Sequence, residues 1–512
     1  MSSSKFLEAF RSIARSHADT IAYRTSREGE AVTYGELNRA SDALAAFLSK
    51  RAPEGLPVVI YGHKSSLMLT SFLAAAKAGV PYAPVDVAYP SDRIADILEQ
   101  IGQPLVLDLS DDGLPCAPAL SSQILDANTV RDAAAGEGFC DPRWQVSGND
   151  IFYLLFTSGS TGRPKGVQMP SRCVDAFMDY FQKLFPAGED RVSFNRVPYT
   201  FDVSLFDIIA GLSRGYTLYA LESECEQSVA ATFEALHKSN LTTWVSTPSF
   251  IEMCLVDPAF SPELLPRLDS IVLCGEVLRN ATALKILERF PGVNLYNTYG
   301  PTETQAVTDI LVTRELAEAI NPLPVGYLSP GVRAVIRDLE TGEALGAGET
   351  GEVYLEGNTV SLGYWKRPDL TDAAFTPCAA PDGSASRIYK TGDKGHLDAE
   401  GRLFCLGRLD FQVKINGFRV ELGDVEQGLA SLPAVKEAVV LPAERDGRVT
   451  HLVAHVLLDD SASPRDFRAG QKIKAELKHA LPDYMVPKKI VFHDEFPLTV
   501  NGKIDRKALA QR

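Results

Sequence analysis

One long string of hydroxyl and glycine residues is suited to bind phosphate. It runs from Thr157 to Gly166, TSGSTGRPKG, and directly follows the apolar segment IFYLLF. A strand that opens into such a loop presents backbone N–H and side-chain O–H groups to phosphate oxygens, and its glycines let the backbone approach an anion closely. The alternative, an ordinary Gly/Ser turn, is less favoured because the complete string follows a strand. The predicted phosphate contacts are Thr157, Ser158, Gly159, Ser160, Thr161, Gly162 and Lys165.

This loop differs from the Walker phosphate loop. The Walker motif has glycine before its lysine and serine or threonine after it, where the hydroxyl binds magnesium. Pro164 and Gly166 stand in those two places around Lys165. The string therefore indicates another class of phosphate site.

Two other patterns resemble functional motifs but fail a structural condition. Residues Gly346 to Gly351 fit G-x-G-x-x-G, yet the strand-like EVYLEG follows them where a dinucleotide site needs a helix. His451 and His455 have the spacing of helical zinc ligands, but VTHLVAHVLL has the pattern of a strand, which would separate them by about 13 Å. We expect a turn at the first pattern and two ordinary sheet residues at the second.

The elements that must position the loop alternate between helical and strand patterns. Apolar residues recur at helical spacing from Tyr34 to Lys50. Alternation of helices and buried strands is typical of α/β layers. Short apolar runs predict such strands at Val58–Tyr61, Ile151–Phe156, Ser270–Cys274 and Val293–Tyr296.

The pattern changes beyond Gly351 to short strands bounded by glycine, and a compact stretch after Leu409 has its own order of strand, strand, helix and strand. We therefore predict a large N-terminal domain of layered α/β subdomains with a β-rich part, residues 1–409, and a small α+β domain, residues 410–512. The segment Ser110–Gly138, rich in Ala, Asp and Gly, is predicted to be a surface loop.

Composition is that of an ordinary globular protein. The 512 residues exceed what one hydrophobic core usually organises, and the net charge of -15 disfavours binding to nucleic acid or to anionic lipid. Eight cysteines without a C-x-x-C pair predict reduced thiols and no zinc ribbon. Neither a signal peptide nor a membrane-spanning run is recognisable, so we expect a cytoplasmic protein.

Further motifs follow one another in a fixed order along nearly the whole chain. Together with TSGSTGRPKGV they resemble the adenylate-forming superfamily, which includes acyl-CoA ligases, firefly luciferase and the adenylation domains of peptide synthetases. The resemblance implies that the chain activates a carboxylate with ATP. The motifs are KAGVPYAPVD from Lys77, FDVS from Phe201, NTYGPTE from Asn297, YKTGD from Tyr389, GRLDFQVKINGFRVELGDVE from Gly407 and PLTVNGKIDR from Pro497.

The resemblance also implies roles for single residues. Lys503 of NGKIDR would be the catalytic lysine that bridges the substrate carboxylate and the phosphate. Asp393 would bind the ribose hydroxyls, with Arg408 as its cationic companion in catalysis and nucleotide binding. Tyr299 would stack on adenine, and Glu303 would hold magnesium, a hard cation that prefers oxygen ligands. The other implied ATP contacts are Gly275, Glu276, Asn297, Thr298, Gly300 and Thr302.

The FDVS motif predicts the class of substrate. Asp202 matches the acid that binds the α-ammonium group in amino-acid-activating members of the superfamily, and a carboxylate that faces an ammonium suits a zwitterion. A polar loop residue is the alternative. The other implied wall residues are mostly apolar and favour a small side chain, with D-alanine as the best candidate: Val203, Phe206, Val245, Val272, Cys274, Thr298, Ala306 and Val307.

A second half-reaction is implied as well. No segment with a pantetheine-bearing serine follows NGKIDR in the sequence, so we expect the acceptor to be the phosphopantetheine thiol of a separate carrier protein. Asp410 would be the hinge on which the small domain turns between the two half-reactions. Lys414 and Gly417 would line the pantetheine tunnel.

Three alternatives remain open. The chain could activate another small amino acid, such as L-alanine, glycine or L-proline. It could be an acyl-CoA ligase that uses free coenzyme A, although Asp202 argues against this. It could also be a non-enzymatic nucleotide-binding protein, but such a protein would be expected to have lost Lys503, Glu303 or Asp393.

Overall fold

The computed structural model describes residues 3–26, 30–116, 123–159, 163–188, 190–221, 228–379, 385–445, 448–459, 466–497 and 504–510. The chain forms two compact units. The first unit comprises Met1–Asp86, Ile101–Leu155 and Gly166–Leu409. The second unit comprises Val87–Gln100, Phe156–Lys165 and Asp410–Arg512. The predicted phosphate loop therefore belongs to the second unit, and the last segment of that unit begins at Asp410.

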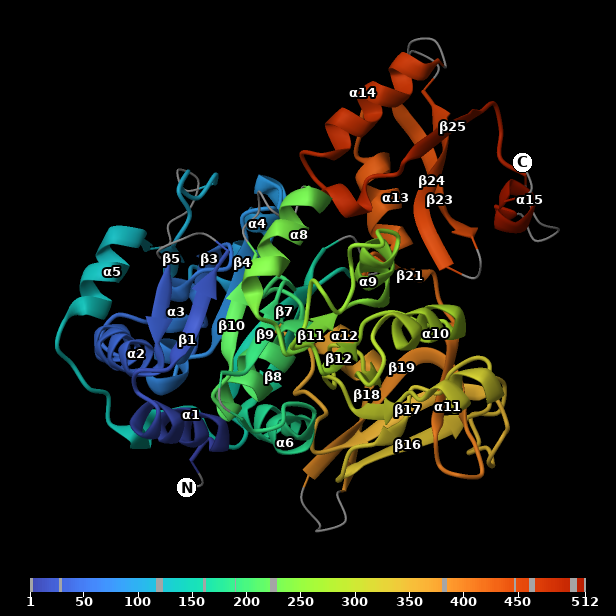
Figure 1. Cartoon of the computed structure of the whole chain (residues 1–512). Helices are drawn as coiled ribbons and strands as arrows, with labels where there is room; N and C mark the ends of the chain where they lie inside the picture. Colours follow the sequence, from blue (N-terminus) through green and yellow to red (C-terminus); the bar gives the residue numbers. More distant parts are fainter. Residues whose placement is uncertain are drawn as a thin grey trace. The chain divides into compact units, whose positions relative to one another are not determined.

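A nine-stranded sheet, in the order β15-β14-β13-β12-β11-β9-β10-β1-β2, is the centre of the first unit (Figure 1). Its middle strands pair in parallel and are buried, as is typical of strands covered on both faces. Antiparallel strands lie towards both edges. The strands are β1 (Ile21–Thr25), β2 (Ala31–Thr33), β9 (Val192–Asn195), β10 (Thr217–Ala220), β11 (Thr243–Ser246), β12 (Ser270–Leu273), β13 (Asn294–Tyr299), β14 (Thr308–Leu311) and β15 (Tyr327–Leu328).

A six-stranded sheet, in the order β6-β5-β3-β4-β7-β8, contains the strand that leads into the predicted phosphate loop. Strands β3, β4 and β5 consist entirely of buried residues. The strands are β3 (Val58–Gly62), β4 (Tyr82–Asp86), β5 (Val106–Asp108), β6 (Ile124–Asp126), β7 (Ile151–Thr157) and β8 (Lys165–Pro170).

An antiparallel sheet forms the β-rich part of the first unit. Its strand order is β16-β17-β19-β18, and β20 pairs with β19. The register sets Asp393 of β19 directly opposite Arg408 of β20. The strands are β16 (Val332–Arg337), β17 (Gly351–Gly357), β18 (Phe375–Ala379), β19 (Ala385–Leu397) and β20 (Leu403–Arg408).

The segment from Asp410 onward has its own hydrophobic core and a three-stranded sheet in the order β23-β24-β25. Its first hairpin turns at Asn416 and Gly417, whose φ values of 50° and 86° are those of a two-residue type I′ turn. The elements are β21 (Gln412–Ile415), β22 (Phe418–Glu421), α13 (Leu422–Ala430), β23 (Val435–Arg445), β24 (Arg448–Leu458), α14 (Phe467–Leu477), β25 (Lys489–His493) and α15 (Arg506–Ala510).

Helices accompany the sheets. The longest described helix, α2 (Tyr34–Leu48), begins with a capping box in which Thr33 and Glu36 each accept a backbone N–H of the other. The others are α1 (Lys5–Ser16), α3 (Ser66–Lys77), α4 (Ser91–Ile101), α5 (Ala127–Ala135), α6 (Ser171–Phe181), α8 (Val229–Ser239), α9 (Pro248–Leu255), α10 (Asn280–Arg289), α11 (Arg314–Ala319) and α12 (Pro368–Ala374).

The predicted α/β fold class is confirmed, and both rejected motifs have the local structure that we expected. The strand β17 begins at Gly351, at the end of the G-x-G-x-x-G string. His451 and His455 both lie on β24, and the ring of His455 contacts His493 of β25. The segment Ser110–Gly138 was predicted wrongly, because its described part contains β6 and α5. Asp126 caps α5 by accepting the N–H of Thr129, and Val130 is buried.

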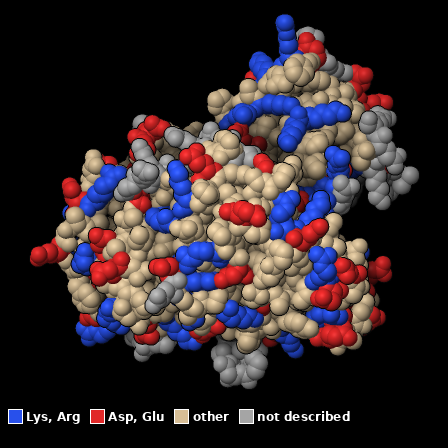
Figure 2. Space-filling view, in the orientation of Figure 1, with Lys and Arg blue, Asp and Glu red and all other residues tan. Residues whose placement is uncertain are grey.

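No helix in the described residues is both long and apolar enough to cross a membrane. Lysine and arginine side chains are interspersed with aspartate and glutamate over the face shown in Figure 2. The net charge of -15 is therefore not gathered into one acidic field on this face.

A buried lysine ties α3 to α2. Lys77 is 1% exposed, and its ammonium bonds to Asn38 Oδ1 (2.9 Å), Ser41 Oγ (2.8 Å) and Asp42 Oδ1 (2.8 Å). Burial lowers the pKa of Lys77 to about 8, although Asp42 opposes this shift. The charge is tolerated at this depth because every N–H has an acceptor.

We expect Lys77→Ala to lower the free energy of unfolding by about 3 kcal/mol, at the lower end for a broken buried ion pair because Asp42 still reaches water. Urea unfolding of the purified protein measures the change. Lys238→Ala is the matched control, because Lys238 forms an exposed pair with Glu234 at 3.1 Å and should contribute almost nothing. Equal stability of the two variants would contradict the expectation.

Candidate active site

The predicted phosphate loop begins where β7 ends. Thr157 is the last residue of β7, and within the described part of the chain its buried hydroxyl has no hydrogen-bond partner, as expected where a ligand completes the site. A Cβ on Gly159 would lie 2.3 Å from the carbonyl oxygen of Arg163, so the tight path of the loop requires glycine. Lys165 opens β8. Ser160, Thr161 and Gly162 lie outside the described residues.

Two carboxylates of α4 hold Arg163, which lies in the second half of this loop. Arg163 Nε donates to Asp96 Oδ1 at 2.6 Å, and its Nη2 donates to Glu99 Oε2 at 2.6 Å. The charge of Arg163 is therefore paired with two carboxylates of α4.

The NTYGPTE motif comprises the end of β13 and the first part of the loop that leads to β14. The N–H of Val307 donates to the carbonyl of Tyr299 across this loop (2.8 Å). A Cβ on Gly300 would lie only 1.8 Å from the carbonyl oxygen of Gln305, so the returning backbone leaves space for hydrogen alone. Thr302 is half-buried in the loop and Glu303 is completely buried. The glycine thus determines where the carboxylate of Glu303 lies.

Glu303 is the residue predicted to hold magnesium. Tyr364 donates its hydroxyl to Glu303 Oε1 at 2.7 Å and so orients the carboxylate. No group of three or more His, Cys, Asp or Glu side chains suited to a metal was found among the described residues. A single oriented carboxylate nevertheless fits magnesium, which proteins often bind through one or two carboxylates together with substrate phosphates.

Three of the predicted nucleotide residues meet at Asp393. Tyr299 of β13 donates its hydroxyl to Asp393 Oδ2 at 2.5 Å, and Arg408 donates to Asp393 Oδ1 at 3.0 Å and to the carbonyl of Thr391 at 2.6 Å. Burial, with the negative charge of Asp393, raises the pKa of Tyr299, so the phenol stays a donor. The carboxylate is therefore held from both sides by donors.

The remaining predicted nucleotide contacts follow β12 or lie on β13. Gly275, at φ +89°, comes directly after the buried Cys274, and a Cβ there would touch Val203 at 3.5 Å. Glu276 accepts the N–H of Ser249 in the first turn of α9 at 2.9 Å. Two other side chains bond to backbone carbonyls and so hold the local strands: Asn297 to Pro324 (2.9 Å) and Thr298 to Leu273 (3.0 Å).

Most residues of the predicted substrate wall belong to one large hydrophobic cluster, which also contains much of the core of the first unit. Val245 of β11 lies opposite Val272 of β12 in register. Val307 is buried in a neighbouring cluster with Tyr299. The members of the cluster that belong to the predicted wall are Val203, Phe206, Val245, Val272, Cys274 and Ala306.

Asp202 begins a short 3₁₀ helix, Asp202–Ser204, and is only partly buried. Its charge adds to burial in raising the pKa of Tyr153, so the two side chains are close enough to interact. A partly exposed carboxylate beside an apolar wall is the arrangement expected for binding an ammonium group.

Residues assigned to the second half-reaction lie in the second unit. Asp410 is exposed and accepts the N–H of Gln412 at 3.1 Å, while Lys414 lies half-buried on β21 and Gly417 completes the type I′ turn. Lys503 lies outside the described residues.

Sequence reasoning missed Tyr364, which is separated from Glu303 by 61 positions in the chain. Tyr364 belongs to SLGYW, a string that follows β17 and carries no charged side chain. The signal that could have indicated its role was an aromatic hydroxyl in a string of mostly apolar residues.

Comparison with protein families identifies the class of protein to which this fold belongs. Residues 10–365 match the family described as AMP-binding enzyme, and residues 424–503 match the AMP-binding enzyme C-terminal domain. The chain belongs to this AMP-binding enzyme family and is an AMP-forming ligase.

Relatives match over nearly the full length. Proteins named D-alanine–D-alanyl carrier protein ligase are 39% identical in Bacillus velezensis, over 99% of each chain, and 39% identical in Listeria monocytogenes, over 94% of each chain. The solved structure of holo-PA1221, described as an NRPS protein containing adenylation and PCP domains, has a TM-score of 0.83 at 25% identity. It covers 100% of this chain and 84% of that one.

We expect Gly300→Ala to lower the adenylation rate on the order of 100-fold, because the methyl group must displace the loop that positions Glu303. Amino-acid-dependent exchange of pyrophosphate into ATP measures the rate. Gly470→Ala on α14 is the control, since its Cβ would meet Ile490 at an ordinary 3.7 Å. A Gly300→Ala enzyme of normal activity would exclude the proposed constraint.

Proposed function

We propose that this chain activates D-alanine with ATP and transfers the D-alanyl group to the phosphopantetheine thiol of a separate carrier protein. The observation that carries the proposal is the likeness over nearly the full length to proteins named D-alanine–D-alanyl carrier protein ligase. The partly exposed Asp202 beside a small apolar wall supports it, since D-alanine offers an ammonium group and one methyl.

In the first step, a carboxylate oxygen of the amino acid attacks the α-phosphorus of ATP, and pyrophosphate leaves. Two anionic groups must approach, so the enzyme has to neutralise charge and hold the reacting oxygens in line. Lys503 would bridge the carboxylate and the phosphate, while the loop from Thr157 to Lys165 would hold the phosphate oxygens. Asp202 would fix the ammonium group at the other end of the substrate.

The nucleoside end would be held by the groups that converge on Asp393. Its carboxylate would accept from the ribose hydroxyls, and the ring of Tyr299 would pack against adenine. Arg408 already contacts Asp393 Oδ1 at 3.0 Å and would hold this carboxylate in place. The other predicted ATP contacts, from Gly275 to Thr302, would line the nucleotide.

Magnesium is part of the proposal because the triphosphate needs a counter-charge. Glu303 would hold the ion through the carboxylate that Tyr364 orients. When bound, magnesium would withdraw charge from the phosphate oxygens and help pyrophosphate to leave.

In the second step, the pantetheine sulfur attacks the acyl carbon, its proton is lost, and AMP leaves. The phosphate chemistry and the thiol chemistry need different faces of the same carbon. We therefore propose that the domain formed by residues 410–512 turns about Asp410 between the steps. Lys414 and Gly417 would then line the tunnel for the pantetheine arm. The requirement for ATP supports a cytoplasmic location.

The proposal predicts that D-alanine supports pyrophosphate exchange best among D-alanine, L-alanine, glycine, L-serine and L-proline. The preference over L-alanine should be about 10- to 100-fold, because one misplaced methyl group is worth about 1–3 kcal/mol. Lys503→Ala serves as the inactive reference, with a rate at least about 100-fold lower.

Loading assays then separate the acceptors. A holo carrier protein should receive the D-alanyl group, and free coenzyme A should not. Preference for another amino acid would overturn the D-alanine assignment but leave adenylation intact. Efficient loading of coenzyme A would instead indicate an acyl-CoA ligase.

We further expect Cys274→Ala to admit L-alanine while D-alanine activation stays near the wild-type level. Cys274 is buried in the wall and would lie close to the substrate α-carbon, where its sulfur could crowd the methyl group of one enantiomer. The ratio of kcat/KM for the two enantiomers is the measurement. Cys254→Ala is the control, because Cys254 is buried in a different cluster, and it should leave the ratio unchanged. An unchanged ratio in Cys274→Ala would mean that the sulfur of Cys274 has no stereochemical role.

A further inference from the structure

The segment that carries Asp202 is tied at both of its ends to the same strand, β9. At the first end, Tyr199 donates its hydroxyl to Asn195 Oδ1 at 2.8 Å. At the second end, Asn195 Nδ2 donates to Asp207 Oδ2 at 3.3 Å, and the hydroxyl of Ser193 donates to Asp207 Oδ1. The amide of Asn195 thus joins the residues that flank Asp202 in the chain.

Burying the carboxylate of Asp207 at this position costs free energy. Its side chain is 0% exposed, and burial raises its pKa to about 7 despite the bonds from Ser193 and Asn195 and the positive charge of Lys64. Neutral, well-packed residues often replace buried ionic groups without loss of stability. A completely buried carboxylate at this point therefore suggests a role in setting geometry.

The backbone around Asp207 supports this interpretation. After the 3₁₀ helix Asp202–Ser204, residues Phe206–Gly211 form a π-helix. Such helices are rare and occur frequently at functional sites. Neither conformation is what local helix preferences would select, so contacts from outside the segment must define its path.

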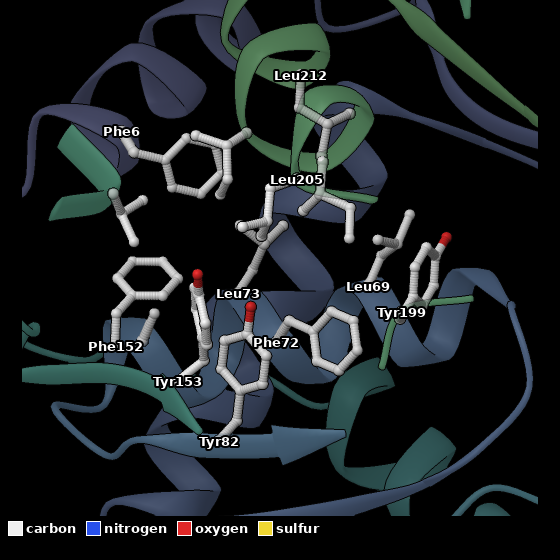
Figure 3. Close-up of a cluster of buried hydrophobic side chains, with 14 of the residues drawn as sticks. Phe6, Leu69, Phe72, Leu73, Tyr82, Phe152, Tyr153, Tyr199, Leu205 and Leu212 are labelled. Atoms are coloured by element: carbon white, nitrogen blue, oxygen red, sulfur yellow. The ribbon is translucent and has the colours of Figure 1, made fainter. Parts of the chain in front are cut away.

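Apolar contacts hold the same segment from its other side. Figure 3 shows Tyr199 and Leu205 among the buried side chains of one cluster, with Leu69, Phe72 and Leu73 of α3. The ring of Tyr199 meets that of Phe72 edge to face, with centroids 5.5 Å apart. Apolar contacts therefore pack the segment around Asp202 into the core, and the hydrogen bonds to β9 fix the path of its backbone.

We propose that Asp207 is a positioning residue for substrate recognition: with Asn195 and Ser193, it fixes the segment whose Asp202 binds the substrate ammonium group. The inference rests on the proposed function for the role of Asp202. Asp207 itself would not contact the substrate. It acts through Asp202 and through the wall residues Val203 and Phe206 next to it.

The test compares Asp207→Ala with Asp207→Asn in the pyrophosphate exchange assay. Asp207→Ala should raise the KM for D-alanine about 10-fold or more and leave the KM for ATP within about 2-fold. Asp207→Asn should recover much of the loss, because its amide oxygen can accept from Asn195 while its N–H donates to the Ser193 hydroxyl. If Asp207→Ala does not fold, Tyr199→Phe replaces it: this variant removes the bond to Asn195 at the first end and should likewise raise the KM for D-alanine more than the KM for ATP.

Inhibition by propanoate separates positioning from general loosening of the pocket. Propanoate has the carboxylate and carbon chain of alanine but no ammonium group, so its inhibition constant should stay unchanged when Asp202 is displaced. A parallel rise in the propanoate constant and in both KM values would mean that Asp207 supports only the fold. An unchanged KM for D-alanine in a folded Asp207→Ala enzyme would also overturn the proposal.

Lys77→Ala is the control for lost stability. It removes another buried charge of the first unit, on α3, and should lower stability without altering the KM for D-alanine. Failure of the proposed function has a different outcome, because the wild-type enzyme would then activate another substrate or none. If it activates another amino acid, the same KM comparison is made with that amino acid.

Discussion

The proposed nucleotide end of the site depends on one buried carboxylate, Asp393, which joins two sheets. Asp393 lies on β19 of the antiparallel sheet, yet Tyr299, which donates to it, ends β13 of the nine-stranded sheet. Arg408 supplies the second donor from the end of β20. A buried carboxylate is stable only when its charge is compensated, so the three side chains fix the distance between the two sheets. Arg408 also stands two residues before Asp410, so it connects the predicted ribose-binding acid to the proposed hinge.

Two other buried carboxylates of the first unit are also held by hydrogen-bond donors, and these two orient segments of the backbone. Glu303 is oriented by Tyr364, and Asp207 is oriented by Ser193 and Asn195. Each carboxylate is completely buried, and each stands in or beside a loop with an unusual path. A buried carboxylate has lost its hydration and needs hydrogen-bond donors from the protein. It therefore constrains the positions of those donors more strongly than an apolar residue of the same size would. The backbone near the site is thus held by charge and packing together.

Much of the fold and of the candidate site could be predicted from sequence, because motifs such as TSGSTGRPKG and NTYGPTE combine a loop, its glycines and its reactive groups within ten residues. The contact of Tyr364 with Glu303 could not, since it joins distant positions and neither residue type implies the other. Ser110–Gly138 was misjudged because its alanines were read as surface composition, although alanine is the best helix former and Asp126 is a good cap. The π-helix at Phe206–Gly211 depends on contacts that no local pattern encodes.

The site is also divided by origin. The predicted substrate wall comes from β11, β12 and β13, from the loop after β13 and from the segment around Asp202. The predicted ribose-binding acid comes from β19, and the predicted phosphate loop follows β7. Substitutions at Val245 or Val272 are therefore expected to reshape the space for a side chain without moving the residues predicted to contact ATP. Asp202 is the exception, since its carboxylate is proposed to bind the ammonium group that all α-amino acids share. The segment that holds Asp202 must stay fixed while the wall varies, and this is the physical reason to anchor it to β9 at both ends.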